Sequence, residues 1–187
     1  MKTKGHNYER FQGWRLIALL VVFTAYTLLF IGPGPFGDLA RLQGYDSLQE
    51  RGFYSGTEAV AAIESLSAEG RAVKYKALGF DFIYMVLQTW VFEAVIAFGL
   101  IALGWMSSRW RWLLLAPMFF LLFDFLEDSF LALVLATSSE LVGSLAGIFT
   151  LIKFVIFIPL VLLSLGFGVA GTVAIILRKR KGAAGSN

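Results

Sequence analysis

The chain has 187 residues, of which 58% are hydrophobic and 16% are charged, with a formal net charge of +3. Soluble domains hold roughly 45–50% apolar and about 25% charged residues, so this composition, gathered in long apolar blocks, predicts an integral membrane protein. The chain has no cysteine, and its one histidine, His6, lies in a polar segment. This excludes disulfides, Cys-ligated iron–sulfur clusters and His-based haem, triad or di-iron chemistry within the membrane. We therefore expect no cofactor and no metal site.

Four apolar blocks are long enough to span a membrane, which takes about 20 residues per helix. They cover about 14–31, 78–106, 112–137 and 142–177. The first ends at GPGPFG, which cannot continue a helix. No A-x-A-like cleavage site follows it, so we expect a retained anchor. The last is longer than one span and is expected to tilt or to begin at the interface. The predicted fold is an all-α, four-helix membrane bundle, forming one domain over 1–187.

The connection 32–77 is the only long polar segment between the predicted spans. Within it, the sequence SGTEAVAAIESLSAEG predicts one amphipathic helix on the outer face of the membrane. Thr57 suits its N-cap, and Val60, Ile63 and Leu66 form an apolar stripe. Gly70 suits its C-terminal stop. We expect this helix to cover the bundle as a structural cap, with a gating lid as the alternative.

Lysine and arginine are distributed unequally on the two sides of the predicted spans. The two tails and the segment between the second and third spans hold ten: Lys2, Lys4, Arg10, Arg15, Arg109, Arg111, Arg178, Lys179, Arg180 and Lys181. The long connection holds five: Arg41, Arg51, Arg71, Lys74 and Lys76. Because positive residues favour the cytoplasmic side, we expect both termini in the cytoplasm and the protein in the inner membrane. This arrangement explains the basic charge without a nucleic-acid partner.

Six ionisable residues fall within the predicted spans, where such residues are costly and often functional. They form a predicted buried charged cluster: Asp81, Glu93, Asp124, Glu127, Asp128 and Lys153. Counting about 1.5 Å per residue along each helix places Lys153 at the depth of Glu127 and Asp128. We therefore expect Lys153 to pair with one of these two acids. One lysine cannot neutralise three acids, so the others must be protonated, hydrogen-bonded, hydrated or bound to a cation.

Two interpretations of these charges remain open from the sequence. The first is a polar clasp that fixes the register of neighbouring helices. The second is a working proton or ion site, beside which Pro159 would kink the fourth helix and free the carbonyl of Val155. Asp124 and Asp128 also form a D-x-x-x-D pattern that resembles the aspartate-rich motif of membrane prenyltransferases. That resemblance implies a magnesium-bound diphosphate, although a second aspartate-rich motif is missing.

Small residues recur at four-residue spacing along the fourth block and permit close helix packing. The predicted packing residues are Gly143, Gly147, Ser164, Gly168 and Thr172. They place the helix either in the centre of its own bundle or against a membrane-protein partner or a second copy. The scarcity of site chemistry favours a non-catalytic accessory or assembly subunit of a larger membrane complex. The alternatives are a proton- or cation-coupled carrier or channel, and a metal-dependent lipid-modifying enzyme.

Overall fold

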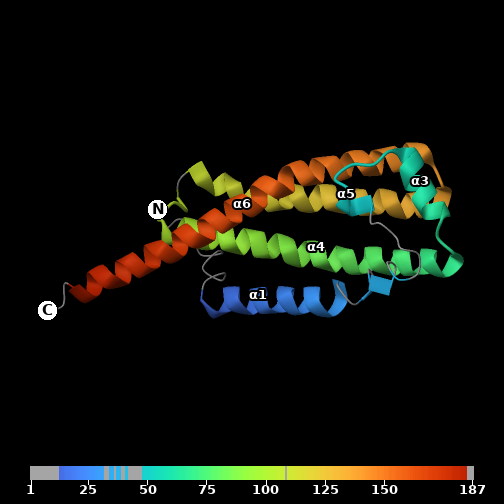
Figure 1. The fold of residues 1–187 in the computed structure, drawn as a ribbon. Coiled ribbons are helices and arrows are strands. Elements are labelled where there is room, and N and C mark those ends of the chain that lie inside the picture. The colour runs from blue at the N-terminus through green and yellow to red at the C-terminus, as the bar shows by residue number, and fades with distance from the viewer. Residues whose placement is uncertain are drawn as a thin grey trace.

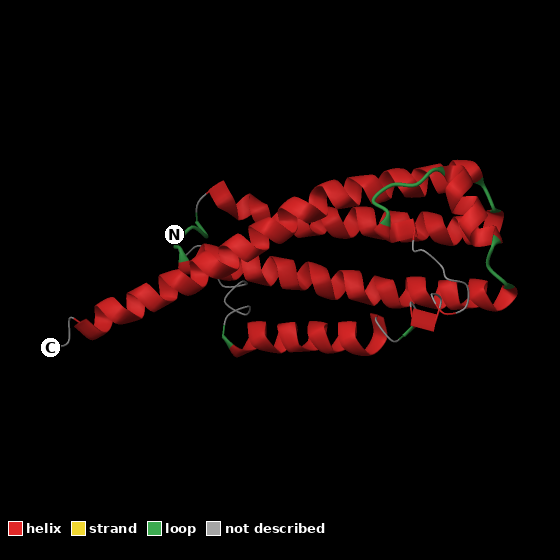
Figure 2. Cartoon of the chain, in the orientation of Figure 1, coloured by secondary structure: helices red, strands yellow, loops and turns green. Residues whose placement is uncertain are grey.

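The computed structural model is all-helical in the part of the chain that it describes, with no strand there (Figures 1 and 2). It describes residues 13–31, 34–35, 37–38, 41, 48–107 and 109–184. The elements are α1 (Trp14–Tyr26), η3 (Thr27–Ile31), η4 (Leu48–Glu50), α3 (Gly56–Glu64), α4 (Ala68–Ala102), η5 (Arg109–Leu115), α5 (Ala116–Thr137) and α6 (Glu140–Ala184). His6 and the first basic residues lie outside the described residues.

Within the described residues, three helical segments are long and apolar enough to cross a membrane, which indicates an integral membrane protein. They are Trp14–Ile31, Ala68–Ala102 and Glu140–Lys181. Helix α5 has 22 residues and is also long enough to cross a membrane. However, its middle holds three acids within the five residues from Asp124 to Asp128. These acids are the reason why composition alone does not place α5 among the apolar spans.

The long helices run side by side, and α1 is attached to the others through α4 (Figure 1). The hydroxyl of Tyr26 donates to the carbonyl of Phe80 at 2.8 Å, and the rings of Phe23 and Tyr84 stack at 5.3 Å. The start of α1, residues 103–107, η5 and the end of α6 lie at one end of the molecule, here called the tail end. Helix α3 and the turn between α5 and α6 lie at the opposite end, the loop end.

Helix boundaries differ from the sequence expectations in the long connection. The predicted single helix is two: α3 ends at Glu64, and Ser67 caps the start of α4 by accepting from the N–H of Gly70 at 3.1 Å. Gly70 is therefore inside α4 and is not a helix stop, and α4 begins at Ala68 within the predicted connection. Two further boundaries differ from the predicted spans 112–137 and 142–177. Helix α5 begins at Ala116, after η5, and α6 continues to Ala184.

The N-cap of α3 is Ser55, two residues before the predicted Thr57. The Ser55 hydroxyl accepts from the N–H of Glu58 at 3.2 Å, while the Glu58 carboxylate accepts from the N–H of Ser55 at 2.7 Å. This is a reciprocal capping box, in which a serine and a glutamate three residues later satisfy each other's free N–H groups. The glutamate spacing therefore marks Ser55 as the cap, whereas Thr57 has no acid three residues after it.

Two separate apolar cores lie at the two ends of the helices. The loop-end core combines residues of the connection and α3 with residues of α4, α5 and α6: Leu48, Tyr54, Ala59, Ile63, Leu66, Leu78, Leu131, Val134, Leu135 and Ala146. The tail-end core is richer in phenylalanine: Phe92, Ile96, Ala97, Leu100, Leu113, Leu114, Phe120, Leu160 and Phe167. Along each of α4, α5 and α6, the residues between these two cores include the charged ones.

Candidate functional site

The candidate site is a polar layer between the two apolar cores. Helix α4 contributes Asp81, helix α5 contributes Asp124, Glu127 and Asp128, and helix α6 contributes Lys153. The three acids of α5 are spaced i, i+3 and i+4, so they share one helix face. Glu127 is fully buried, and Asp124 and Asp128 are 6% and 7% exposed. We call Asp81, Asp124, Glu127 and Asp128 the carboxylate cluster.

Lys153 pairs with two members of the carboxylate cluster. Its Nζ lies 3.1 Å from Oδ1 of Asp124 and also contacts Oε2 of Glu127. The predicted contact with Glu127 is present, and the second partner is Asp124 where the sequence offered Asp128. Thr150, one turn before Lys153 on α6, donates its hydroxyl to Oε1 of Glu127 at 2.6 Å. Both oxygens of Glu127 are therefore held by α6.

Asp128 is bound instead by a side chain from the long connection. Gln49 of η4 donates its amide to Oδ1 of Asp128 at 2.6 Å, with a longer contact of 3.3 Å to Oδ2 of Asp81. Its own carbonyl accepts from Nζ of Lys74 at 2.9 Å. Lys74 is 1% exposed and Gln49 is 8% exposed. The connection thus reaches into the bundle and links a second buried lysine to the carboxylate cluster.

Sequence reasoning missed three members of this layer: Gln49, Lys74 and Thr150. Lys74 and Gln49 lie in the segment assigned to the outer surface, and Lys74 was counted only as a charge flanking a span. The available signal was spacing, because Lys74, Leu78 and Asp81 follow one helix face at i, i+4 and i+7. That pattern places Lys74 on the buried side of an α4 that begins earlier than hydropathy alone suggests.

Glu93 is not brought into the carboxylate cluster. It lies twelve residues after Asp81 on α4, about 18 Å further along the helix axis, and is half-buried beside the tail-end core. The prediction grouped all six ionisable residues because each is within a predicted span. The helical rise separates Glu93 from the other five, since they lie nearer the loop end.

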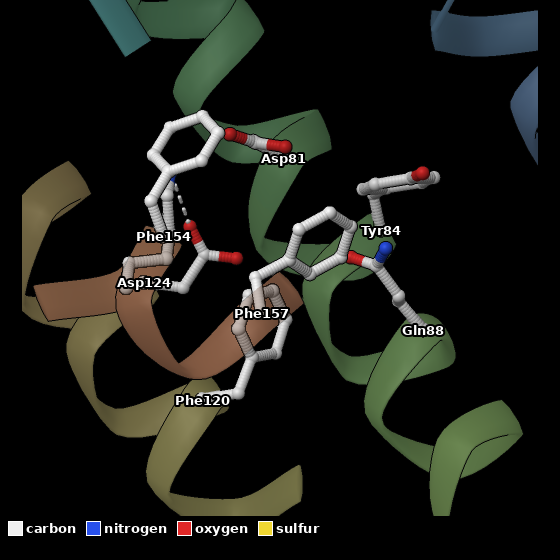
Figure 3. Close-up of a pocket in the computed structure, with 8 residues that line it drawn as sticks. Asp81, Tyr84, Gln88, Phe120, Asp124, Phe154 and Phe157 are labelled. Carbon is white, nitrogen blue, oxygen red and sulfur yellow. Dashed lines mark ion pairs between the residues drawn. The ribbon is translucent and has the colours of Figure 1, made fainter. Parts of the chain in front are cut away.

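A pocket of about 290 Å³ borders the carboxylate cluster (Figure 3). Its polar lining comes from Asp81, Tyr84 and Gln88 of α4, Asp124 of α5 and Lys153 of α6. Its apolar lining is Phe120, Phe154 and Phe157. Figure 3 shows the side chains of three helices converging around this space, with the ion pair to Asp124 on one side.

Aromatic rings close the pocket on the side of the tail-end core. Phe120 and Phe157 have ring centroids 5.4 Å apart, and each lies 6.0 Å from the ring of Phe92. One ring comes from each of α5, α6 and α4. Such pairs add about 0.5–1.5 kcal/mol beyond simple burial in soluble proteins. The pocket therefore has a rigid aromatic floor and a charged wall.

The small residues of α6 contact this chain's own elements. A Cβ added at Gly147 would collide with the carbonyl of Tyr54, and one at Gly143 would lie 2.9 Å from Cβ of Ala59. Further along, a Cβ at Gly168 would lie 3.3 Å from Val95 of α4. The first two glycines thus seat α3 and the connection on α6, and Gly168 lets α6 approach α4.

The remaining packing residues are placed less uniformly. Ser164 is buried at 6% exposure, whereas Thr172 is exposed and donates to the carbonyl of Gly168 at 2.8 Å. Pro159 lies inside α6, and Figure 1 shows α6 changing direction along its length. A proline within a helix removes one backbone hydrogen bond and bends the helix.

Comparisons of the chain with family models, with curated proteins and with solved structures found no match. Within the described residues, no three acids or histidines come together as ligands for a metal ion. The chemistry of the polar layer and its pocket is therefore what indicates a function.

Proposed function

We propose that the protein binds an exchangeable proton or monovalent cation at the carboxylate cluster and carries it across the membrane. The observation that carries the proposal is the charge balance. Among the described residues, the four acids of the cluster contact or neighbour two buried lysines, Lys74 and Lys153. Burying an uncompensated carboxylate is costly, so a bound proton or cation is the cheapest way to remove the excess negative charge.

The membrane arrangement that accompanies this proposal has four spans. We place α5 in the membrane beside α1, α4 and α6, because its three acids face the interior layer while its other faces are apolar. Helix α3 then lies at the outer surface, and both termini face the cytoplasm of a cell with this protein in its inner membrane. Lysine and arginine support this orientation through the ten-to-five distribution on the two sides.

The absence of cysteine from the sequence makes this orientation directly testable. A single Ser107→Cys at the tail end and a single Ser65→Cys at the loop end should label oppositely with a membrane-impermeant maleimide in intact cells. Ser65→Cys is expected to react from outside, and Ser107→Cys only after the membrane is permeabilised. The reverse pattern would invert the proposed topology.

Flux into liposomes tests the function. The purified protein is reconstituted with an internal pH dye, and a potassium diffusion potential is imposed. We expect proton uptake, or uptake of Na⁺ or K⁺ in matched gradients, that Glu127→Gln reduces at least tenfold. Glu93→Gln is the control, because it removes an intramembrane acid of α4 outside the cluster. Equal flux for both variants, or no flux in any gradient, would contradict the proposal.

An accessory subunit of a larger membrane complex remains a second candidate, and α1 is the observation that favours it. None of its residues is buried, and within the described residues its main contacts with the long helices are with α4. Isolation from native membranes in mild detergent, with mass spectrometry, tests this candidate. A stoichiometric complex that dissociates when bulky substitutions are placed on the exposed face of α1, such as Val21→Trp, would support it. An unaffected homogeneous monomer or homo-oligomer would contradict it.

A further inference from the structure

We propose that the pocket beside the carboxylate cluster binds an organic cation with an apolar, ring-containing body. This deepens the proposed function and rests on it, since the organic cation would be a second ligand beside the cluster that carries the proton or inorganic cation. The juxtaposition that carries the proposal is one weakly partnered carboxylate, Asp81, facing a pocket whose other wall is aromatic (Figure 3).

The charge available to a ligand in the pocket is negative. Lys153 already contacts two carboxylates, those of Asp124 and Glu127, so its positive charge is matched twice. Asp81 has, within the described part of the chain, one hydrogen-bond contact, the 3.3 Å approach of the Gln49 amide. An anionic ligand would meet two acids and a neutralised lysine, whereas a cation would supply the partner that Asp81 lacks.

The aromatic lining favours an organic cation over a hydrated metal ion. The rings of Tyr84, Phe120, Phe154 and Phe157 line the pocket, and Nζ of Lys153 lies 5.8 Å from the centroid of the Phe154 ring. Ring faces attract cations by about 0.5–2 kcal/mol, more when the cation is desolvated, and they exclude the water that a small inorganic ion would retain. A volume of about 290 Å³ suits a single small ring with its charged group.

The pocket is also reachable and anchored. Asp81, Tyr84 and Gln88 are half-buried, so each leaves part of its surface open. Tyr84 is held by stacking on Phe23 of α1 at 5.3 Å, and the floor rings are held by contacts among α4, α5 and α6. A ligand would therefore meet a preformed wall and would not need to order it, which lowers the cost of binding.

Equilibrium dialysis tests the inference with two water-soluble probes. Phenyltrimethylammonium is the cation, and benzenesulfonate is an anion with a similar aromatic body. The protein is held in nanodiscs of neutral phosphatidylcholine, so that lipid charge does not select between the probes. We expect saturable binding of the cation at one site per chain, at least tenfold tighter than binding of the anion.

Variants assign the binding to this pocket. Asp81→Asn should weaken binding of the cation at least tenfold, and Phe157→Ala about threefold to thirtyfold, as expected for one lost cation–ring contact. Glu93→Gln should leave it unchanged. Gln88→Lys places a positive charge in the pocket without altering the carboxylate cluster, and should abolish binding of the cation. It keeps the test decisive if Asp81→Asn does not fold.

The outcomes separate this inference from the proposed function. No saturable binding of the cation, equal binding of both probes, or binding that survives both Asp81→Asn and Gln88→Lys would overturn the inference. Proton or inorganic-cation flux is measured without either probe, so its persistence would then leave the proposed function standing. Conversely, charge-selective binding that depends on Asp81, in a protein without flux, would support the pocket and refute the proposed ion transport.

Discussion

The two apolar cores close the polar layer in different ways. The tail-end core is built mainly from the long helices, and its rings from α4, α5 and α6 contact one another. The loop-end core takes Leu48 and Tyr54 from the long connection, each 1% exposed, and Tyr54 and α3 pack on the glycines of α6. One closure is thus part of the bundle, and the other is a segment seated on it.

This difference assigns distinct roles to the two ends. Moving the tail-end core requires three long helices to separate, because their aromatic side chains are interlocked. Moving the loop-end closure requires the release of Tyr54 and α3 from α6 and α5, and of Gln49 in η4 from α4 and α5. Gln49 links that closure to Asp128 and Lys74 by hydrogen bonds. Movement of the connection would therefore remove hydrogen-bond partners from two charged side chains of the polar layer. We therefore expect access to the layer from the loop end.

The largest expected loss of stability follows removal of Lys153, which Asp124 and Glu127 share. It tests the polar layer that lies between the two cores. Lys153→Met removes the positive charge from Asp124 and Glu127, and breaking a buried ion pair costs roughly 3–5 kcal/mol in soluble proteins. Glu127→Gln with Lys153→Met should recover part of that loss, because fewer buried charges are left without a partner. Unfolding in detergent measures both. A double variant as destabilised as the sum of the single variants would contradict the coupling.

A methyl group at Gly147 tests the loop-end closure alone. Gly147→Ala drives Cβ into the carbonyl of Tyr54, and overpacking of this kind costs about 1–3 kcal/mol. Gly166→Ala is the matched control on the same helix, because nothing lies within 4 Å of its added Cβ. It should be neutral or stabilising by up to about 1 kcal/mol, as alanine favours helix over glycine. Equal thermal stability of the two variants would show that α3 and Tyr54 are not seated on α6 as described.

Gln49→Leu separates the loop-end closure from the polar layer without removing its bulk. The variant deletes the amide that accepts from Lys74 and donates to Asp128, and lost partners of buried polar groups cost about 1–3 kcal/mol each. Hydrogen exchange of the amides in 48–64 should increase, while exchange in the tail-end core should stay as in the wild type. A uniform increase across both cores would contradict their independence.

The smallest expected effect concerns the cap of α3. Ser55→Ala removes the N-cap hydroxyl, which is worth about 1 kcal/mol. In the wild type, hydrogen bonds from the backbone N–H and hydroxyl of Ser55 hold the pKa of Glu58 below its ordinary value. Because the folded pKa is then below the unfolded value, near 4.3, this stabilisation is present above that value and is lost as pH falls through the folded pKa.

The pH dependence provides the measurement. The difference in melting temperature between wild type and Ser55→Ala should be constant near neutrality and shrink on acidification below about pH 4.3, the unfolded pKa of glutamate. A difference that grows on acidification would contradict the capping box.

Much of the bundle follows from hydropathy, whereas the polar layer follows only in part. Apolar length predicted α1, α4 and α6, and counting helical rise placed Lys153 level with Glu127. The same count could not choose between Asp124 and Asp128, which flank Glu127 on one helix face. It also could not reveal that Gln49 would donate a hydrogen bond to Asp128, because a three-residue turn within a polar connection has no periodicity that places its side chains.

The loop end shows why local signals failed. Gly70 has the properties of a helix stop, but Ser67 supplies a new cap and Lys74, Ala77 and Leu78 give the following residues a buried face. Tertiary burial therefore decided where α4 begins. The spacing of Gly143 and Gly147 correctly predicted that another element packs closely on α6 there. Glycine spacing carries no information about which element makes that contact.

The central claim is that the carboxylate cluster holds an exchangeable proton or cation, and infrared spectroscopy of the reconstituted protein tests it most directly. We predict a carbonyl band of a protonated, buried carboxylic acid at neutral pH that shifts on exchange into D₂O. The band should decrease with Asp128→Asn but not with Glu93→Gln, or else appear only when Na⁺ and K⁺ are removed. Absence of that band with and without these cations would mean that every acid is ionised and fully compensated by protein, and would contradict the account.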